Sequence, residues 1–165
     1  MPAPEPRIDR PEIPGEYGLS RATEYVTWDH VASRLAVALA YWLGTIGPTG
    51  RPSVRPVDGV FVDGTLFIGG SPETAWVRHV QTHPDVSIHL DGLDDVVIVD
   101  GRAEVLGSVE AGVAGRLATA SNAKYPQYGM TPAFYRKNGA IAVHIRKVVA
   151  WTDISRDPTR FRFDR

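Results

Sequence analysis

The residues best suited to chemistry in this sequence surround a Gly-Gly pair. Gly69–Gly70 precedes Ser71 and Pro72, and a serine followed by a proline predicts that a helix begins here with Ser71 as its N-cap. The first N–H groups of a helix have no backbone partner and lie at the positive end of its dipole, so they favour an anion such as phosphate. Arg78 follows two turns later and could add a guanidinium, whereas Glu73 in the first turn could itself supply the negative charge. A phosphate site and an ordinary capped helix are equally compatible with these residues.

Two further arginines are candidates because they share one face of a predicted strand. Arg51 and Arg55 flank Ser53, and alternate residues of a strand point to the same side of a sheet. On a solvated face such a pair needs no function. Beside a cofactor groove it would supply positive charge for phosphate or carboxylate groups.

Other catalytic patterns are weak or missing. His79 and His83 would share one helix face, as two metal ligands do, but the glutamate and third ligand of a zinc protease motif are missing. The sequence has no G-x-G-x-x-G, P-loop or G-x-S-x-G pattern. It has no cysteine, which excludes disulfides and thiolate chemistry. We therefore predict no metal site and disfavour Rossmann, P-loop and hydrolase functions.

Aromatic residues offer only weak functional signals. Tyr125 and Tyr128 lie in a loop that could cover a site, and either could donate a proton, although no residue is predicted to be catalytic on firmer ground. Trp42, Trp76 and Trp151 are expected in the core or at a dimer contact rather than under a ligand.

The elements that would position these residues are mostly strands. Thr27 is expected to cap a first helix, Asp63–Gly64 to form a hairpin turn, His83–Pro84 to end the second helix and Ser108 to cap the third. The expected strands are residues 40–46, 52–62, 65–68, 86–90, 96–106, 140–145 and 148–154, followed by a short tail at 159–163.

This order predicts a mainly β, α+β fold. Strands joined by direct hairpins must pair antiparallel, so we expect a closed or nearly closed antiparallel barrel with peripheral helices. Residues 1–20 contain five prolines and are expected to form an extended arm, while residues 21–165 form one domain.

Composition limits the partners and the compartment. The chain has 165 residues, 43% hydrophobic residues and a formal net charge of -1, so we expect no binding to nucleic acid or to anionic membranes. Its N-terminus lacks the apolar run of a signal peptide, and no stretch approaches the roughly 20 apolar residues of a membrane span. A cytoplasmic protein is the expectation.

Several segments, taken in order, resemble the pyridoxamine 5'-phosphate oxidase-like, FMN-binding split-barrel superfamily. They are Leu43–Ile46, Thr49–Pro52, Val54–Val57, Gly64–Ile68, Arg78–Pro84 and Val97–Val105. The tail, with Val149–Thr152 and Asp157–Phe163, is similar to actinobacterial members, in particular the branch that uses the deazaflavin coenzyme F420.

The resemblance implies a homodimer with a flavin or deazaflavin at the subunit interface. Carried over to this chain, it implies a ring bordered by Arg55, Pro56 and Val57, and a phosphate near Gly70, Ser71, Thr74 and Arg78. The family often has a lysine two residues before the arginine, where this chain has Trp76, which implies weaker FMN binding. The chain also lacks the Arg-Leu-x-Pro ending of true pyridoxamine 5'-phosphate oxidases, so vitamin B6 oxidation is not expected.

F420 is the favoured cofactor, with FMN as the alternative. Arginines are 15 of the 18 basic residues, a bias typical of high-GC genomes, and the long anionic tail of F420 would give Arg51, Arg55 and Lys124 a role. We expect an oxidoreductase that transfers hydride between the reduced deazaflavin and a small organic acceptor. The alternatives are a non-enzymatic cofactor carrier and a haem- or tetrapyrrole-binding protein with His79, His83 or His144 as ligand.

Overall fold

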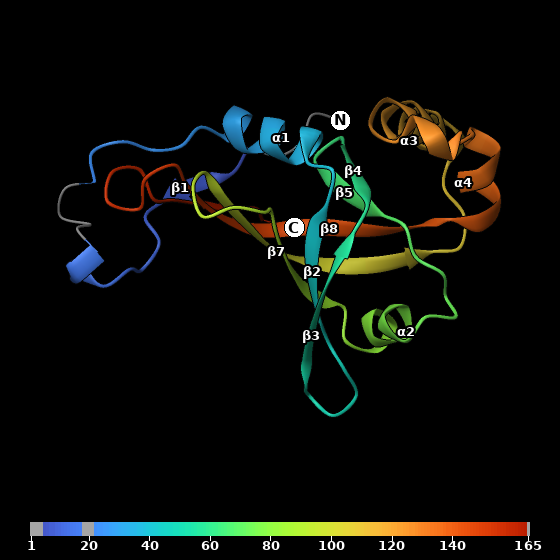
Figure 1. Ribbon diagram of the computed structural model, residues 1–165, viewed down its shortest axis with the longest axis horizontal. Coiled ribbons are helices and arrows are strands. Elements are labelled where there is room, and N and C mark those ends of the chain that lie inside the picture. The colour runs from blue at the N-terminus through green and yellow to red at the C-terminus, as the bar shows by residue number, and fades with distance from the viewer. Residues whose placement is uncertain (1–4, 18–21, 165) are drawn as a thin grey trace.

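In the computed structural model, residues 5–17 and 22–164 are described, and nine strands within them form one sheet (Figure 1). The strands are β1 (Arg7–Asp9), β2 (Tyr41–Ile46), β3 (Pro52–Val57), β4 (Gly59–Val62), β5 (Thr65–Ile68), β6 (Asp85–His89), β7 (Val96–Leu106), β8 (Ala140–Trp151) and β9 (Thr159–Arg162). The α-helices are α1 (Trp28–Val37), α2 (Ala75–Thr82), α3 (Ala111–Lys124) and α4 (Pro132–Asn138), and short 3-10 turns are η1 (Gly15–Tyr17) and η3 (Pro126–Tyr128).

The sheet is antiparallel throughout and does not close. Its order is β1-β9-β8-β7-β6-β2-β3, and the β4–β5 hairpin joins it through β8. In the described part of the chain, β3 pairs with β2 and β4 pairs with β5, but β3 and β4 do not pair with each other. The predicted α+β split-barrel fold is therefore confirmed, with the split between two strands that follow each other in the chain.

The split lies where the sequence predicted one strand over residues 52–62. That prediction is wrong because the chain breaks at Asp58 and passes from one side of the split to the other. Gly59 is required after the break, since a Cβ there would lie 2.7 Å from the carbonyl oxygen of Phe67. The hairpin turn that follows is confirmed, because Asp63 and Gly64 both have positive φ, as a type I′ turn requires.

The C-terminal strands also differ from the prediction. The sequence indicated two strands, whereas β8 is one strand of 12 residues with a bulge. Asp100 pairs with Lys147 but Gly101 pairs with Ile145, so Arg146 is the extra residue. Gly101 of β7 lies opposite this bulge, where a Cβ would lie 2.8 Å from the carbonyl oxygen of His144.

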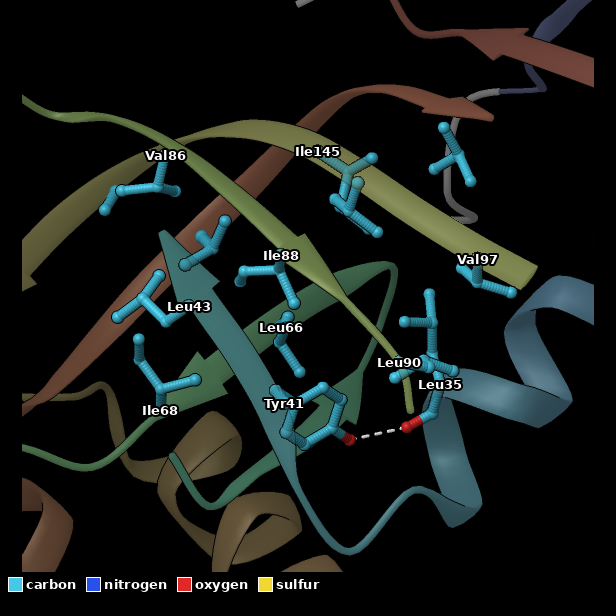
Figure 2. Packing of buried hydrophobic residues seen from close by; sticks show 14 of the residues in the cluster. Leu35, Tyr41, Leu43, Leu66, Ile68, Val86, Ile88, Leu90, Val97 and Ile145 are labelled. Atoms are coloured by element: carbon cyan, nitrogen blue, oxygen red, sulfur yellow. Dashed lines mark hydrogen bonds between the residues drawn. The ribbon is translucent and has the colours of Figure 1, made fainter. Parts of the chain in front are cut away.

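The barrel interior is filled by the inward-facing residues of the strands and by α1 (Figure 2). Thr27 caps α1 as predicted, since its side chain accepts a hydrogen bond from the N–H of His30. Val31 and Leu35 are fully buried, and the hydroxyl of Tyr41 donates to the carbonyl oxygen of Leu35 (Figure 2). This bond fixes the end of α1 to the start of β2.

Helix α3 begins later than predicted. Ser108 is not its cap, because the Ser108 hydroxyl donates to the carbonyl oxygen of Arg136, while the Glu110 carboxylate accepts from the N–H groups of Gly112 and Val113. Leu117 is buried in a second cluster beside β4. Helix α4, which the sequence analysis missed, packs on α3.

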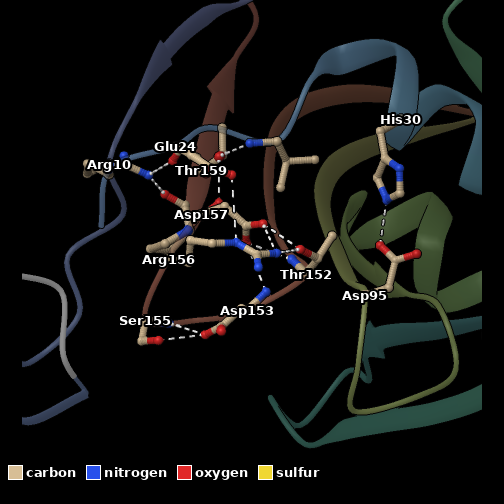
Figure 3. A network of polar contacts seen from close by, with 12 residues as sticks. Arg10, Glu24, His30, Asp95, Thr152, Asp153, Ser155, Arg156, Asp157 and Thr159 are labelled. Atoms are coloured by element: carbon tan, nitrogen blue, oxygen red, sulfur yellow. Dashed lines mark hydrogen bonds and ion pairs between the residues drawn. The ribbon is translucent and has the colours of Figure 1, made fainter. Parts of the chain in front are cut away.

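The turn between β8 and β9 is held by Asp157 (Figure 3). Its buried carboxylate accepts from the N–H groups of Thr152 and Asp153. The expected tail forms β9, which pairs with β1 from the proline-rich N-terminal segment. Arg160 makes two hydrogen bonds to Asp9 across this pair.

None of the helices in the described segments has the length and apolar character that crossing a bilayer requires.

Candidate functional site

A cavity of about 750 Å³ lies beside the split, between the sheet and the α3–α4 pair. Most of its lining is apolar, including Phe67 of β5, Val105 of β7 and Phe134 of α4. The polar side chains that reach it are those of Asp58, Ser71, Ser121, Tyr125, Tyr128, Tyr135 and Asn138. This size and mixture are those of a small-molecule pocket.

Asp58 marks the polar end of the cavity. It is the single residue between β3 and β4, and it lies close to the loop after β5, since a Cβ on Gly69 would be 3.2 Å from Asp58 Oδ1. A hydrogen bond to the Asp58 carboxylate raises the pKa of Tyr128. The Tyr128 ring stacks on that of Tyr125, with centroids 5.4 Å apart. A carboxylate, a phenol and an aromatic wall therefore meet at one place.

The backbone beneath Asp58 is held by two residues from the end of α3. The Tyr125 hydroxyl accepts a hydrogen bond from the N–H of Gly59 at 3.2 Å. It can donate to the carbonyl oxygen of Leu39 at 3.0 Å or to that of Gly59 at 3.2 Å. Lys124 Nζ donates to the Gly59 carbonyl oxygen at 2.8 Å and to the Tyr41 hydroxyl at 2.7 Å. Of the two tyrosines proposed as proton donors, Tyr125 is therefore engaged in the fold, and Tyr128 is half exposed in the cavity wall.

The half-buried ammonium group of Lys124 makes stability depend on pH. Burial lowers the pKa of Lys124 from 10.5 to about 8, whereas the nearby Asp58 carboxylate opposes that shift. Between these two values the unfolded chain binds the Lys124 proton and the folded chain does not, so the free energy of unfolding rises with pH across that window. We expect Lys124→Met, measured by urea denaturation at several pH values, to lose this rise. A parallel pH dependence of the two proteins would contradict the assignment.

The predicted cofactor residues fall into two groups. Gly70 and Ser71 line the cavity. The remaining predicted residues lie outside the cavity lining: Arg55, Pro56, Val57, Thr74, Trp76 and Arg78. Within this second group Arg55 lies over the ring of Trp76, 5.8 Å from its centroid, and Pro56 is exposed on the opposite face of β3.

The start of α2 differs from the prediction. Ser71 is not the N-cap, because residues 71–74 form a turn in which the N–H and the hydroxyl of Thr74 both donate to the Ser71 carbonyl oxygen. The Ser71 hydroxyl accepts from the N–H of Glu73, and Arg78 donates to the Glu73 carbonyl oxygen. Thr74 is the N-cap but makes no side-chain cap, so the first N–H groups of α2 keep their capacity for a ligand.

The junction between α2 and the β2–β3 hairpin contains unsatisfied polar atoms. Arg55 Nε, Thr45 Oγ1 and His79 Nδ1 are buried, and the described residues supply no hydrogen-bond partner for them. Thr45 pairs across the hairpin with Ser53, whose hydroxyl accepts from Arg55, and the His79 ring lies close to Gly47. Buried polar atoms are rarely left unpaired. Cationic and hydroxyl donors of this kind fit the phosphate of a flavin-type cofactor.

The histidines of the described residues do not come together as a metal-binding cluster. His83 caps the C-terminal end of α2, as predicted, while His144 lies 3.0 Å from Glu104. The described residues contain no group of three or more potential metal ligands. His79, His83 and His144 all lie outside the lining of the large cavity.

Asp58 was missed by the sequence analysis, as was the contribution of α4. Asp58 precedes a glycine in what read as a continuous strand, so its only sequence signal was a polar residue before Gly59. For α4 a local signal existed, since Thr131 and Pro132 have the N-cap and first-position types of a helix start.

The profile of the family described as Pyridoxamine 5'-phosphate oxidase matches residues 27–151. No curated protein matches the chain.

Solved structures share the fold at low identity. A conserved hypothetical protein of Mycobacterium tuberculosis, Rv2991, superposes with a TM-score of 0.63 at 22% identity, covering 81% of this chain and 89% of that one. A protein described as an F420 reductase superposes with a TM-score of 0.51 at 19% identity, covering 69% of this chain and 90% of that one. An FAD-binding protein of Mesorhizobium loti superposes with a TM-score of 0.57 at 16% identity, covering 84% of this chain and 96% of that one.

Proposed function

The chain belongs to the pyridoxamine 5'-phosphate oxidase family, and from this membership and the site we infer that it is an oxidoreductase that uses coenzyme F420. It would transfer hydride between the reduced deazaflavin and a small organic acceptor. Family members are often oxidoreductases, and the similar folds include an F420 reductase and an FAD-binding protein. FMN is the alternative cofactor.

One observation carries the proposal: the loop after β5 joins the two halves of the site. Gly70 packs so closely on Trp76 that a Cβ would lie 2.4 Å from the indole ring, and Gly70 also lines the cavity. A cofactor whose phosphate lay at the α2–hairpin junction would reach the cavity across this loop.

The residues of the chain would bind, orient and shield the cofactor. Arg55 and the uncapped start of α2 would hold its anionic part. The apolar cavity lining would keep water from the reacting groups. The cofactor itself supplies the hydride chemistry when bound. Tyr128 is the residue placed to hold a proton at the cavity wall.

The exposed face of the sheet supports the proposal of a homodimer. Ile46 and Val54 are 41% and 59% exposed on β2 and β3, and Trp42 stacks on His89 of β6 on the same face. Trp42 pairs in register with the exposed Pro56. An apolar sheet face of this kind favours a second copy of the chain, which would cover Pro56 and complete the cofactor groove.

The test is a parallel titration of the cofactor-free protein with F420 and FMN, followed by fluorescence. We expect micromolar or tighter binding of F420 and weaker binding of FMN. The reverse preference would identify an FMN protein, and binding of neither would reject the proposed function. Turnover with an acceptor panel then separates an enzyme from a cofactor carrier.

Trp76→Lys gives this titration a matched variant. It restores the cation that the family often has at this position and removes the ring over which Arg55 lies. Because FMN carries a terminal phosphomonoester, we expect the variant to gain affinity for FMN by about tenfold while its affinity for F420 changes less. An unchanged FMN affinity would show that the phosphate does not approach residue 76.

A further inference from the structure

We propose that the Asp58 end of the cavity binds a cationic or N–H-donating group of the hydride acceptor, and that the acceptor has a planar apolar body. This inference rests on the proposed function for the identity of the occupant. It goes beyond that function by naming the chemical class of the substrate.

The cavity lining contains a single charged residue type, a carboxylate, among the described residues. Among the residues that the structure describes, Asp58 is the one charged side chain that lines the cavity. An ionised carboxylate only accepts hydrogen bonds, and in an apolar surrounding it strongly favours a cation or an N–H group over an anion. An amine, amidine or protonated heterocycle therefore fits this end of the cavity, and a carboxylate or phosphate does not.

The ammonium group of Lys124 interacts electrostatically with Asp58, but the hydrogen bonds that it donates go to other groups. Lys124 Nζ donates to the Gly59 carbonyl oxygen and to the Tyr41 hydroxyl, and it lies outside the cavity lining. The hydrogen-bond partner of Asp58 within the lining is the hydroxyl of Tyr128. The carboxylate therefore keeps acceptor capacity for a ligand in the cavity.

The shape of the ligand follows from the walls. The stacked rings of Tyr125 and Tyr128 stand beside Asp58, and Phe67, Phe134 and Tyr135 line the rest of the cavity. Aromatic walls of this kind bind flat apolar groups by stacking and edge contacts.

The position of Asp58 places the bound group beside the proposed cofactor. Its Oδ1 faces Gly69, in the loop that both lines the cavity and contacts α2. An acceptor held by its polar group at Asp58 would therefore lie next to the segment that the cofactor must cross.

The experiment uses three planar probes of nearly equal shape and different charge. Benzamidine is cationic, benzamide is neutral and benzoate is anionic. Their affinities for the cofactor-free protein are measured by calorimetry and by chemical-shift titration. We expect the affinity to decrease from benzamidine through benzamide to benzoate. We expect Asp58→Asn to weaken the binding of benzamidine by about tenfold or more and to leave the binding of benzamide unchanged.

Two variants control for folding and for Tyr128. Asp63→Asn alters an exposed aspartate outside the cavity whose φ of 52° suits asparagine, and it should change none of the three affinities. Tyr128→Phe removes the hydroxyl that competes for Asp58, so benzamidine should bind at least as tightly as before. Thermal unfolding of each variant shows whether it is folded.

Several outcomes would overturn the inference. Benzoate binding as tightly as benzamidine, or an equal loss of all three probes in folded Asp58→Asn, would show that the carboxylate does not select charge. A loss of F420 affinity in Asp58→Asn with benzamidine unchanged would assign Asp58 to the cofactor instead. If F420 fails to bind but the benzamidine preference holds, the proposed function is rejected and the charge preference of the cavity stands.

Discussion

Gly139→Ala is expected to lower the free energy of unfolding by at least about 3 kcal/mol, the largest effect on stability that we predict for a single methyl group. Gly139 joins α4 to β8 with φ 72° and ψ -159°, a region that residues with a Cβ avoid. A Cβ there would lie 1.6 Å from the carbonyl oxygen of Leu106, on the neighbouring strand. Because the obstacle is backbone, relief requires the strands themselves to move.

Urea denaturation of Gly139→Ala beside Gly115→Ala measures this effect. Gly115 lies within α3, where a Cβ would meet no atom within 4 Å, so alanine should stabilise the helix by about 0.5–1 kcal/mol. Since Gly139 also lines the cavity, its substitution should disturb ligand binding in whatever fraction folds. A loss of less than about 1 kcal/mol for Gly139→Ala would contradict the steric argument.

The sequence predicted those elements whose signals are local. Thr27 caps α1, and the Asp63–Gly64 turn forces the β4–β5 hairpin; each feature is decided by residues adjacent in the chain. Together with the alternation of apolar residues, such signals were enough to predict an antiparallel barrel, whereas the split in it was implied by the family resemblance.

The start of α2 shows where local signals compete. Ser71 followed by Pro72 has the residue types of a helix start, and so does Thr74 followed by Ala75. The hydroxyl of Thr74 settles the outcome by bonding to the Ser71 carbonyl oxygen, which makes residues 71–74 a separate turn. A choice between two capping residues three apart cannot be read from propensity.

The cavity could not be predicted because its parts come together only in the folded chain. Asp58 and Tyr128 are distant in sequence, and Asp58 reaches the cavity because the sheet splits at that residue. The split itself depends on β5 pairing with β8, a contact between segments far apart in the chain. The family resemblance implied that Gly70 and Ser71, which line the cavity, lie near the cofactor phosphate, but it gave no indication of Asp58.

Arg55→Gln is expected to weaken F420 binding by about 10- to 100-fold, the range for losing hydrogen bonds from a charged group. Arg55 is the cation at the α2–hairpin junction, with its Nε buried and unpaired and its guanidinium over Trp76. Burying that nitrogen without a partner is unfavourable, so an anion that accepts from it recovers free energy that the cofactor-free protein has lost. Glutamine keeps much of the side-chain volume and removes the charge.

Arg51→Gln is the matched control. It tests the alternative that both arginines are simply charged residues on a solvated sheet face. Arg51 is exposed in the turn before β3, where its backbone carbonyl oxygen accepts from Gly47. If the junction binds the cofactor's anionic part, Arg55→Gln loses affinity in titrations at constant ionic strength while Arg51→Gln binds nearly as the unmodified protein does. Equal losses in both variants would indicate a general electrostatic attraction instead, since exposed charges act through screened fields that fall together as salt is raised. The difference between the two arginines, measured at low and at high salt, therefore separates a built anion site from a positively charged surface.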